Sequence, residues 1–316
     1  MKKILLSVVC LVMVGMQSVN AQVGIVALHH EGHVTVFGED KIASAIEAAV
    51  AGDTIYMSEG HFLGDVTINK AIHLIGSGQG TTINGNVNID IENNPTVTGY
   101  MLAALNINGD VKPKKSIDGL RISQCKFKSF YPENEITLKN FFMDRSYVTS
   151  DFLTISLDGG TVNNCKIGSI QEIAPIARSY FYHCNYGYYS TNSGTPIGIM
   201  AINCIINQMD GQSHNVYQNC LFNFLNDGYP ENGENCWGHD PVNSTTNIFD
   251  DDCNCVLSDQ ELQANGYIGT DNTVVGITGG DAPYTLKLIT PRVLEHNIVV
   301  DKENKKVNVT LTVGTE

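Results

Sequence analysis

Ala201-Ile202-Asn203-Cys204-Ile205-Ile206 is one copy of a short pattern that recurs through residues 117–238. The pattern reads apolar, any residue, Asn, Cys, any residue, apolar, and some copies replace the Asn or the Cys. Successive copies are 16 to 24 residues apart when they are counted from Cys125, Phe141, Cys165, Cys184, Cys204, Cys220 and Cys236. A period near 20 residues built from short β-rich units is typical of a solenoid.

The pattern has a physical interpretation. Asn tolerates the left-handed αL conformation better than other non-glycine residues, so it marks a turn between two strands. The Cys is then the first inward residue of the next strand, and the apolar residue two positions later points the same way. Stacked coils would place Cys above Cys and Asn above Asn at strand spacing, about 4.8 Å.

On these residues the chain resembles the right-handed parallel β-helix of the pectin-lyase-like superfamily, where asparagine ladders at turns and inward Cys and aliphatic stacks are common. The resemblance covers about residues 41–285, and residues 44–84 resemble the opening coils of secreted β-helix proteins. Residues 273–284 resemble the end of β-helix proteins secreted by gut Bacteroidetes, whose function is largely unassigned. The resemblance implies an all-β chain that folds as one right-handed parallel β-helix.

The two ends of the chain differ from the repeat. Residues 1–21 read as a secretory signal peptide, with a charged start, an apolar stretch and a small-residue cleavage site, which predicts export to the periplasm, the cell surface or the medium. Residues 22–285 are predicted to form the β-helix and residues 286–316 a C-terminal β-hairpin. An amphipathic helix over 41–51, N-capped by Asp40, is predicted to cap the first coil.

Charge and cysteine content narrow the class of protein. Loss of Lys2 and Lys3 with the signal peptide takes the formal net charge from −14 to −16, so nucleic acids and anionic membranes are poor partners. No other segment is long and apolar enough to span a membrane. Six cysteines of the exported chain lie on the repeat, which favours a buried stack of free thiols over disulfides. The state of Cys253 and Cys255 stays open.

A calcium site is one candidate for function. Oxygen ligands fall at positions 1, 3, 5, 9 and 12 of an EF-hand-like loop, namely at Asp250, Asp252, Asn254, Ser258 and Glu261. Cys255 stands where such loops have glycine, and a predicted strand replaces the entering helix. The alternative is an acidic, solvated loop.

Aromatic residues are a second candidate. Several rings near one rung must face outward, because Phe181 and Tyr186 take the inward positions. Flat apolar rings with a polar tip suit sugar rings. The residues predicted to bind a polysaccharide or a cell-surface glycan are Tyr180, Tyr182, Tyr188, Tyr189 and Trp237. The alternative is ordinary packing of a solenoid face.

Catalytic motifs of related enzymes are missing from the sequence. The Gly-Thr-x-Asp-Phe-Ile-Phe-Gly run of pectin methylesterases, the paired acids and Gly-His-Gly of polygalacturonases, and the Arg-x-Pro-x-x-Arg of pectate lyases have no counterpart. Parallel rungs would allow acid pairs such as Asp144 or Asp158 with Asp210. The sequence therefore favours a secreted, non-catalytic protein that is expected to bind glycans. The alternatives are a polysaccharide lyase or hydrolase with an atypical site, and a structural or adhesive surface protein.

Overall fold

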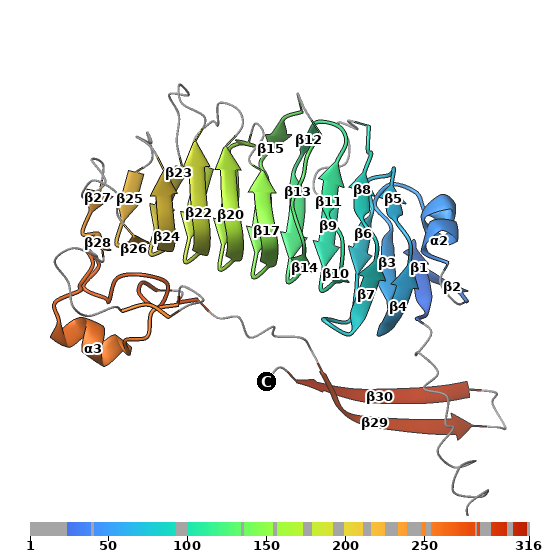
Figure 1. The fold of residues 1–316 in the computed structure, drawn as a ribbon. Helices are drawn as coiled ribbons and strands as arrows, with labels where there is room; N and C mark the ends of the chain where they lie inside the picture. The colour runs from blue at the N-terminus through green and yellow to red at the C-terminus, as the bar shows by residue number, and fades with distance from the viewer. Residues whose placement is uncertain are drawn as a thin grey trace, which may run out of the picture.

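The structure is a computed structural model that describes residues 24–38, 41–92, 100–133, 136–153, 157–172, 179–191, 199–210, 216–224, 233–238, 248–250, 254–281, 283–284, 292–301 and 306–314. Its strands stack coil upon coil into one long parallel β-solenoid (Figure 1). The predicted all-β solenoid is therefore confirmed. The predicted signal peptide lies outside the described residues. No helix among the described residues is long and apolar enough to cross a membrane.

Two large sheets form the long walls of the solenoid, and strands of successive coils pair in parallel register along both. The twelve-stranded sheet contains, in spatial order, β2 (His33–Phe37), β1 (Val26–His30), β3 (Thr54–Met57), β6 (His73–Ile75), β9 (Tyr100–Ala103), β13 (Leu120–Ser123), β16 (Phe142–Asp144), β19 (Thr161–Asn163), β21 (Ser179–Tyr182), β23 (Ile199–Ile202), β25 (Val216–Gln218) and β27 (Gly233–Glu234). The ten-stranded sheet contains β28 (Trp237–Gly238), β26 (Leu221–Phe224), β24 (Ile205–Asp210), β22 (Asn185–Thr191), β20 (Lys166–Glu172), β17 (Tyr147–Leu153), β14 (Lys126–Phe127), β10 (Asn106–Ile107), β7 (Thr81–Asn84) and β4 (Gly60–Leu63).

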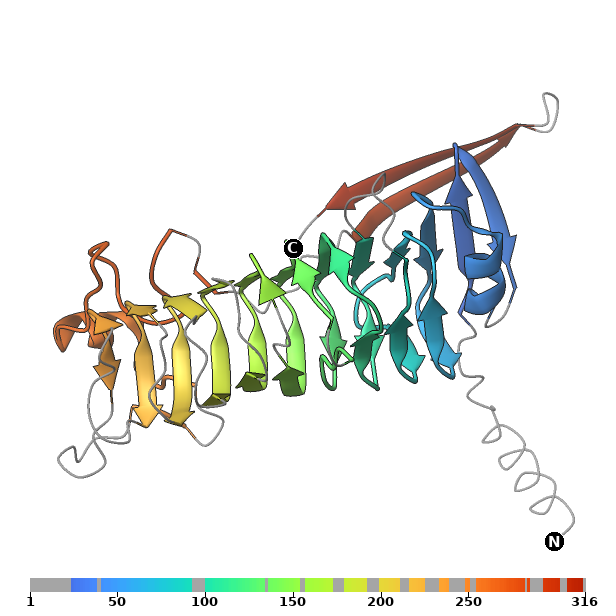
Figure 2. The same cartoon turned by 90° about the horizontal axis from the view of Figure 1, so that it is seen from above.

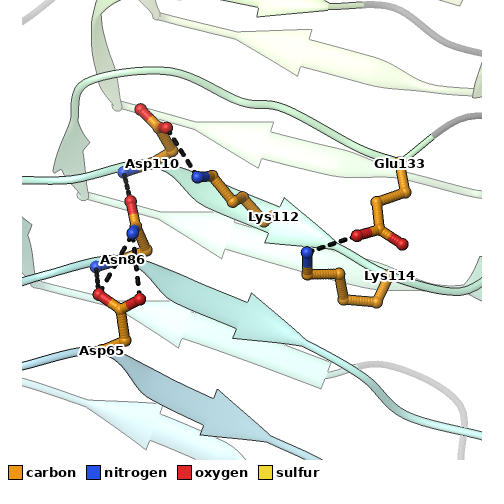
Figure 3. A network of polar contacts seen from close by, with 6 residues as sticks. All are labelled: Asp65, Asn86, Asp110, Lys112, Lys114 and Glu133. Atoms are coloured by element: carbon orange, nitrogen blue, oxygen red, sulfur yellow. Dashed lines mark hydrogen bonds and ion pairs between the residues drawn. The ribbon is translucent and has the colours of Figure 1, made fainter.

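Two small parallel sheets complete the coils. One contains β11 (Val111–Pro113), β8 (Val87–Ile89) and β5 (Val66–Ile68), and the other contains β12 (Ile117–Asp118), β15 (Leu138–Lys139) and β18 (Leu157–Asp158). The corner before the first small sheet repeats a glycine followed by a polar residue. Asn86 donates through its backbone and side-chain nitrogens to Asp65, and Asp110 N donates to Asn86 Oδ1 at 3.0 Å (Figure 3). Ion pairs Lys112–Asp110 and Lys114–Glu133 lie beside this ladder (Figure 3).

The turn between the two large sheets matches the predicted pattern. From the coil of β9 onward, its central residue has a φ between 43° and 56°, at Ala104, Gln124, Arg145, Asn164, His183, Asn203, Asn219 and Asn235. The next residue is buried in every case, at Leu105, Cys125, Ser146, Cys165, Cys184, Cys204, Cys220 and Cys236. The predicted αL turn and inward cysteine column are therefore confirmed.

The predicted rung at Phe141 is wrong. Asn140 also has a positive φ, but it turns the chain between β15 and β16, where the neighbouring coils use Gly119 and Gly159. In the cysteine column this coil contributes Ser146, because Tyr147 pairs with Lys126 and Lys166. With Ser146 in place, the spacing from Cys125 becomes 21, 19, 19, 20, 16 and 16 residues, which is more regular than the sequence pattern suggested.

The N-terminal end carries an antiparallel extension that the sequence pattern did not predict. Strand β1 pairs antiparallel with both β2 and β3, so β2 is the edge of the twelve-stranded sheet. Helix α2 (Ile42–Ala48) lies at this end and buries Ile42, Ala45 and Ile46 (Figure 1). The helix is shorter than the predicted 41–51, and its N-cap residue is Lys41 rather than Asp40. Its role as a cap remains a prediction.

A segment that we call the strap, residues 254–281 and 283–284, folds back along the turn between the two large sheets. It contains helix α3 (Asp259–Ala264), whose N-terminus has a capping box formed by Ser258 and Glu261. Leu262 and Val275 of the strap pack on outward side chains of the ten-stranded sheet, among them Ile205 and Leu221. The strap thus buries an apolar outer surface near the last coils.

Contacts between the strap and the turn residues show its direction. Thr270 N donates to Asn219 Oδ1 at 2.9 Å, and Gly276 N donates to the Asn219 carbonyl. Further along the strap, His183 Nε2 lies 3.0 Å from the Gly279 carbonyl. The strap therefore runs from later coils toward earlier ones as its residue numbers rise.

The C-terminal strands form a sheet of their own. Strands β29 (Arg292–Asp301) and β30 (Lys306–Gly314) pair antiparallel within the segment predicted as a hairpin. Figures 1 and 2 show them alongside the N-terminal half of the solenoid.

Candidate functional site

The outer face of the twelve-stranded sheet carries a group of polar and aromatic side chains on three neighbouring strands. Alternation along β16, β19 and β21 sends Met143, Val162 and Phe181 into the core, where each is fully buried. The residues just before and just after each of these inward residues point outward. We call these the polar–aromatic face: Phe142, Asp144, Thr161, Asn163, Tyr180 and Tyr182.

Asp144, Asn163 and Tyr182 form one row across the three strands, because they are direct partners in the parallel register. Asn163 Nδ2 donates to Asp144 Oδ1 at 3.2 Å, and Arg145 Nε donates to Asp144 Oδ2 at 2.6 Å. Asp144 is only 7% exposed, whereas Arg145 keeps about a third of its side chain exposed. The row therefore presents planar donor and acceptor groups that are held in place by their neighbours.

The aromatic half of the face contains a ring pair. The rings of Tyr180 and Tyr182 are stacked, with centroids 6.0 Å apart and planes 5° apart, and both are half-buried. Partial burial raises the pKa of Tyr182, and the neighbouring Tyr180 adds to this effect. The Tyr182 hydroxyl is thus protonated at neutral pH and can donate or accept hydrogen bonds. The guanidinium of Arg121, on the neighbouring strand β13, lies over the ring of Phe142 on β16, 5.2 Å from its centroid.

The other predicted aromatic residues do not share this face. Tyr188 and Tyr189 lie on β22 in the ten-stranded sheet, in the rows of Ser169 and Ile170. Trp237 lies on β28 in the same sheet and is half-buried, with its ring 4.9 Å from that of Tyr267 in the strap. The predicted set is therefore divided, because the αL turn at His183 separates the two sheets.

Residues of the predicted calcium loop form two pairs. Asn254 N donates to Asp250 Oδ1 at 2.8 Å in a small antiparallel turn, while Ser258 and Glu261 bond to each other at the start of α3. Asp252 lies outside the described residues. Within the described ranges, no three His, Cys, Asp or Glu side chains converge to hold a metal ion. Calcium binding by this segment remains a prediction.

The acids considered for catalysis lie on three different sheets. Asp144 is on the twelve-stranded sheet, Asp158 is on a small sheet, and Asp210 ends β24 of the ten-stranded sheet. The parallel rungs therefore do not bring Asp210 beside either of the others. Asp144 is the only carboxylate of the polar–aromatic face and is already paired with Arg145.

The cysteine column contains free thiols. The seven described cysteines are unpaired, and six of them are buried. Burial raises the pKa of Cys125 to about 12, so its thiol is protonated and unreactive at neutral pH. The six buried cysteines pack as small apolar side chains in the core.

His183 takes an asparagine position in the turn ladder beneath the strap. Its Nε2 faces the Gly279 carbonyl, which can only accept, so Nε2 carries a proton, and its buried Nδ1 has no hydrogen-bond partner. Burial lowers the pKa of this histidine below its ordinary value. The fold therefore prefers the neutral ring.

This preference predicts a pH-dependent stability. The unfolded chain takes up a proton near the ordinary pKa of 6.5, whereas the folded chain does so only at lower pH. The stabilising effect is thus complete above pH 6.5 and declines as the pH falls toward the folded pKa. We expect His183→Asn to flatten the loss of stability between pH 7.5 and 5, as measured by urea denaturation. Equal slopes for the two proteins would contradict this assignment.

Comparison with known proteins adds no relative. No protein-family model matches the chain, and no curated protein or solved structure is significantly similar to it.

Proposed function

We propose that this chain is an exported, non-catalytic glycan-binding protein, and that the polar–aromatic face holds the sugar. The finer fold proposed with it is the right-handed parallel β-helix of the pectin-lyase-like superfamily, similar to exported proteins of Bacteroidetes. Exported, rigid solenoids of this kind offer a long flat surface to an extended polysaccharide.

The observation that carries the proposal is the stacked pair Tyr180 and Tyr182 beside the Asp144–Asn163 row. Half-exposed rings provide an apolar surface for the C–H face of a sugar. The neighbouring carboxylate, amide and guanidinium groups can bond to sugar hydroxyls at fixed positions, as in many ligand sites where few polar groups orient an otherwise apolar contact. A face with a single, paired carboxylate lacks the second acid that glycoside hydrolysis requires, which favours binding over cleavage.

Glycan binding is expected to depend on Tyr182. The exported chain is run through native gels that contain neutral and acidic polysaccharides, with and without calcium, and the mixtures are assayed for cleavage products. Tyr182→Ala is expected to weaken retardation about tenfold, because removal of a stacked ring costs roughly 1 kcal/mol or more. Tyr182→Phe keeps the ring and should retain most of the binding.

Tyr131→Ala is the matched control, because Tyr131 is an exposed tyrosine away from this face. If Tyr182→Ala and Tyr131→Ala bind alike, the site assignment is wrong. If no glycan retards the protein, the proposal of glycan binding is wrong. Adhesion to a protein partner is then the next hypothesis to test. Release of reducing ends or unsaturated products would show instead that the protein degrades the polysaccharide.

A further inference from the structure

The hairpin of β1 and β2 places two histidines opposite each other. Strand β1 ends at His30 and β2 begins at His33, with Glu31 and Gly32 between them at φ 46° and 82°. Two residues of positive φ form the tight turn that suits a two-residue hairpin loop. His30 and His33 are direct partners in the register, so both side chains leave the same face of the hairpin with Cβ atoms about 5 Å apart.

A buried carboxylate orients one of these rings. His30 Nδ1 lies 2.7 Å from Asp53 Oδ1, and Asp53 also accepts a bond from Val50 N. The Asp53 side chain is 6% exposed, while the His30 side chain is 45% exposed. A carboxylate that accepts from one ring nitrogen fixes the tautomer and leaves the other nitrogen as a free electron-pair donor. In His30 that nitrogen is Nε2, on the exposed side of the ring.

Further groups lie around His30 Nε2. Glu31 Oε2 is 4.0 Å away, and His33 is exposed and free to turn its ring toward the same point. His29, by contrast, leaves the opposite face, where its ring packs edge-on against Tyr56 with centroids 4.8 Å apart. Nitrogen and oxygen atoms that can donate electron pairs therefore gather on only one face of the hairpin.

We propose that His30 and His33 chelate a divalent transition-metal ion of the zinc class, with Glu31 and water completing the coordination and Asp53 acting as the positioning residue. Two imidazoles and a carboxylate are donors that zinc accepts at about 2.0–2.2 Å. No three such side chains converge in the described part of the chain, so the proposed site requires the exposed side chains of His33 and Glu31 to rotate toward His30 Nε2. The site is independent of the polar–aromatic face, which lies several coils away on the same sheet.

The test is a zinc titration of the exported chain, purified without a polyhistidine tag, by isothermal calorimetry and by the shift in melting temperature. We expect one zinc ion per chain. His33→Gln should abolish most of the binding, and Asp53→Asn should weaken it about 10- to 100-fold, as loss of an orienting carboxylate does elsewhere. His29→Gln is the matched control, because it removes a neighbouring histidine from the other face, and it should bind zinc as the unaltered chain does.

Folding is checked without metal, because Asp53 is buried and its variant can be unstable. His33 is exposed, so its variant keeps the fold and still removes a ligand. Absence of saturable zinc binding by the unaltered chain would overturn the proposal. So would a His30→Gln, His33→Gln double variant that binds zinc with unchanged affinity.

Discussion

Phe152→Ala is expected to lower the free energy of unfolding by about 3–5 kcal/mol, the range for truncating a buried phenylalanine. Phe152 is fully buried, and its ring is stacked on that of Phe130 with centroids 5.0 Å apart. The rings of Phe141 and Phe181 lie 6.0 and 6.4 Å away. Truncation leaves a cavity bounded by these three rings. Strand β17, which carries Phe152, is paired on both sides, so the backbone cannot collapse around the alanine.

The effect is measured by urea denaturation monitored by circular dichroism. Solenoids can unfold in more than one step, so the m-value is compared as well as the midpoint. The control is Tyr131→Ala, which removes an exposed ring next in sequence to Phe130 and should change stability by less than about 0.5 kcal/mol. A loss of under about 1 kcal/mol for Phe152→Ala would show that this ring cluster is not a central part of the core.

Asn219→Ala is expected to cost about 2–4 kcal/mol and to release the strap. Asn219 is 2% exposed and accepts from Thr270 N and Oγ1 through its side chain. Its removal leaves a donor in the strap without a partner, which costs about 1–3 kcal/mol. Alanine at a φ of 56° adds about 1 kcal/mol, since its Cβ crowds the carbonyl in the αL conformation.

A glycine variant separates these two contributions. Asn219→Gly removes the side-chain acceptor but adopts the αL conformation freely, so it should be less destabilising than alanine by about 1 kcal/mol. Denaturation gives the stability, and limited proteolysis followed by mass spectrometry reports cleavage within residues 266–281. If both variants leave the strap as resistant as before, the Asn219 bonds do not hold it.

The repeat could be predicted from the sequence because its turn chemistry is local. Asn or His before Cys marks the αL turn in the coils of Cys165, Cys184, Cys204 and Cys220, and each prediction was right. The coil between Cys125 and Cys165 failed because Asn140-Phe141 imitates the pattern at a different turn. Its true turn uses Arg145 and Ser146, which carry neither of the expected residue types.

The same register error hid half of the candidate site. The sequence predicted that some of the tyrosines around this rung face outward, and the structure places Tyr180 and Tyr182 there. Asp144 could be aligned with Asn163 and Tyr182 only once Ser146 was recognised as the start of the next strand. A signal was present, because Ser146 restores an even spacing of the coils.

The strap could not be predicted, because its contacts join residues roughly 50 to 100 positions apart in the chain. One outward-facing position of the repeat did indicate that a covering segment exists. The position after the turn residue and the Cys reads Lys126, Tyr147, Lys166 and Asn185, then changes to Ile205, Leu221 and Trp237. Outward apolar residues need a cover, and the strap supplies it.

Because the strap runs from later coils toward earlier ones, it determines how the solenoid would carry a mechanical load. Near its end, Gly279 contacts His183 in the turn between β21 and β22, and the chain continues from Tyr284 to β29. Tension on the C-terminus would therefore act on the middle coils of the solenoid and not on its last coil. Such tension would peel the strap one contact at a time, at Gly279 before Thr270, while the coils beneath stay paired.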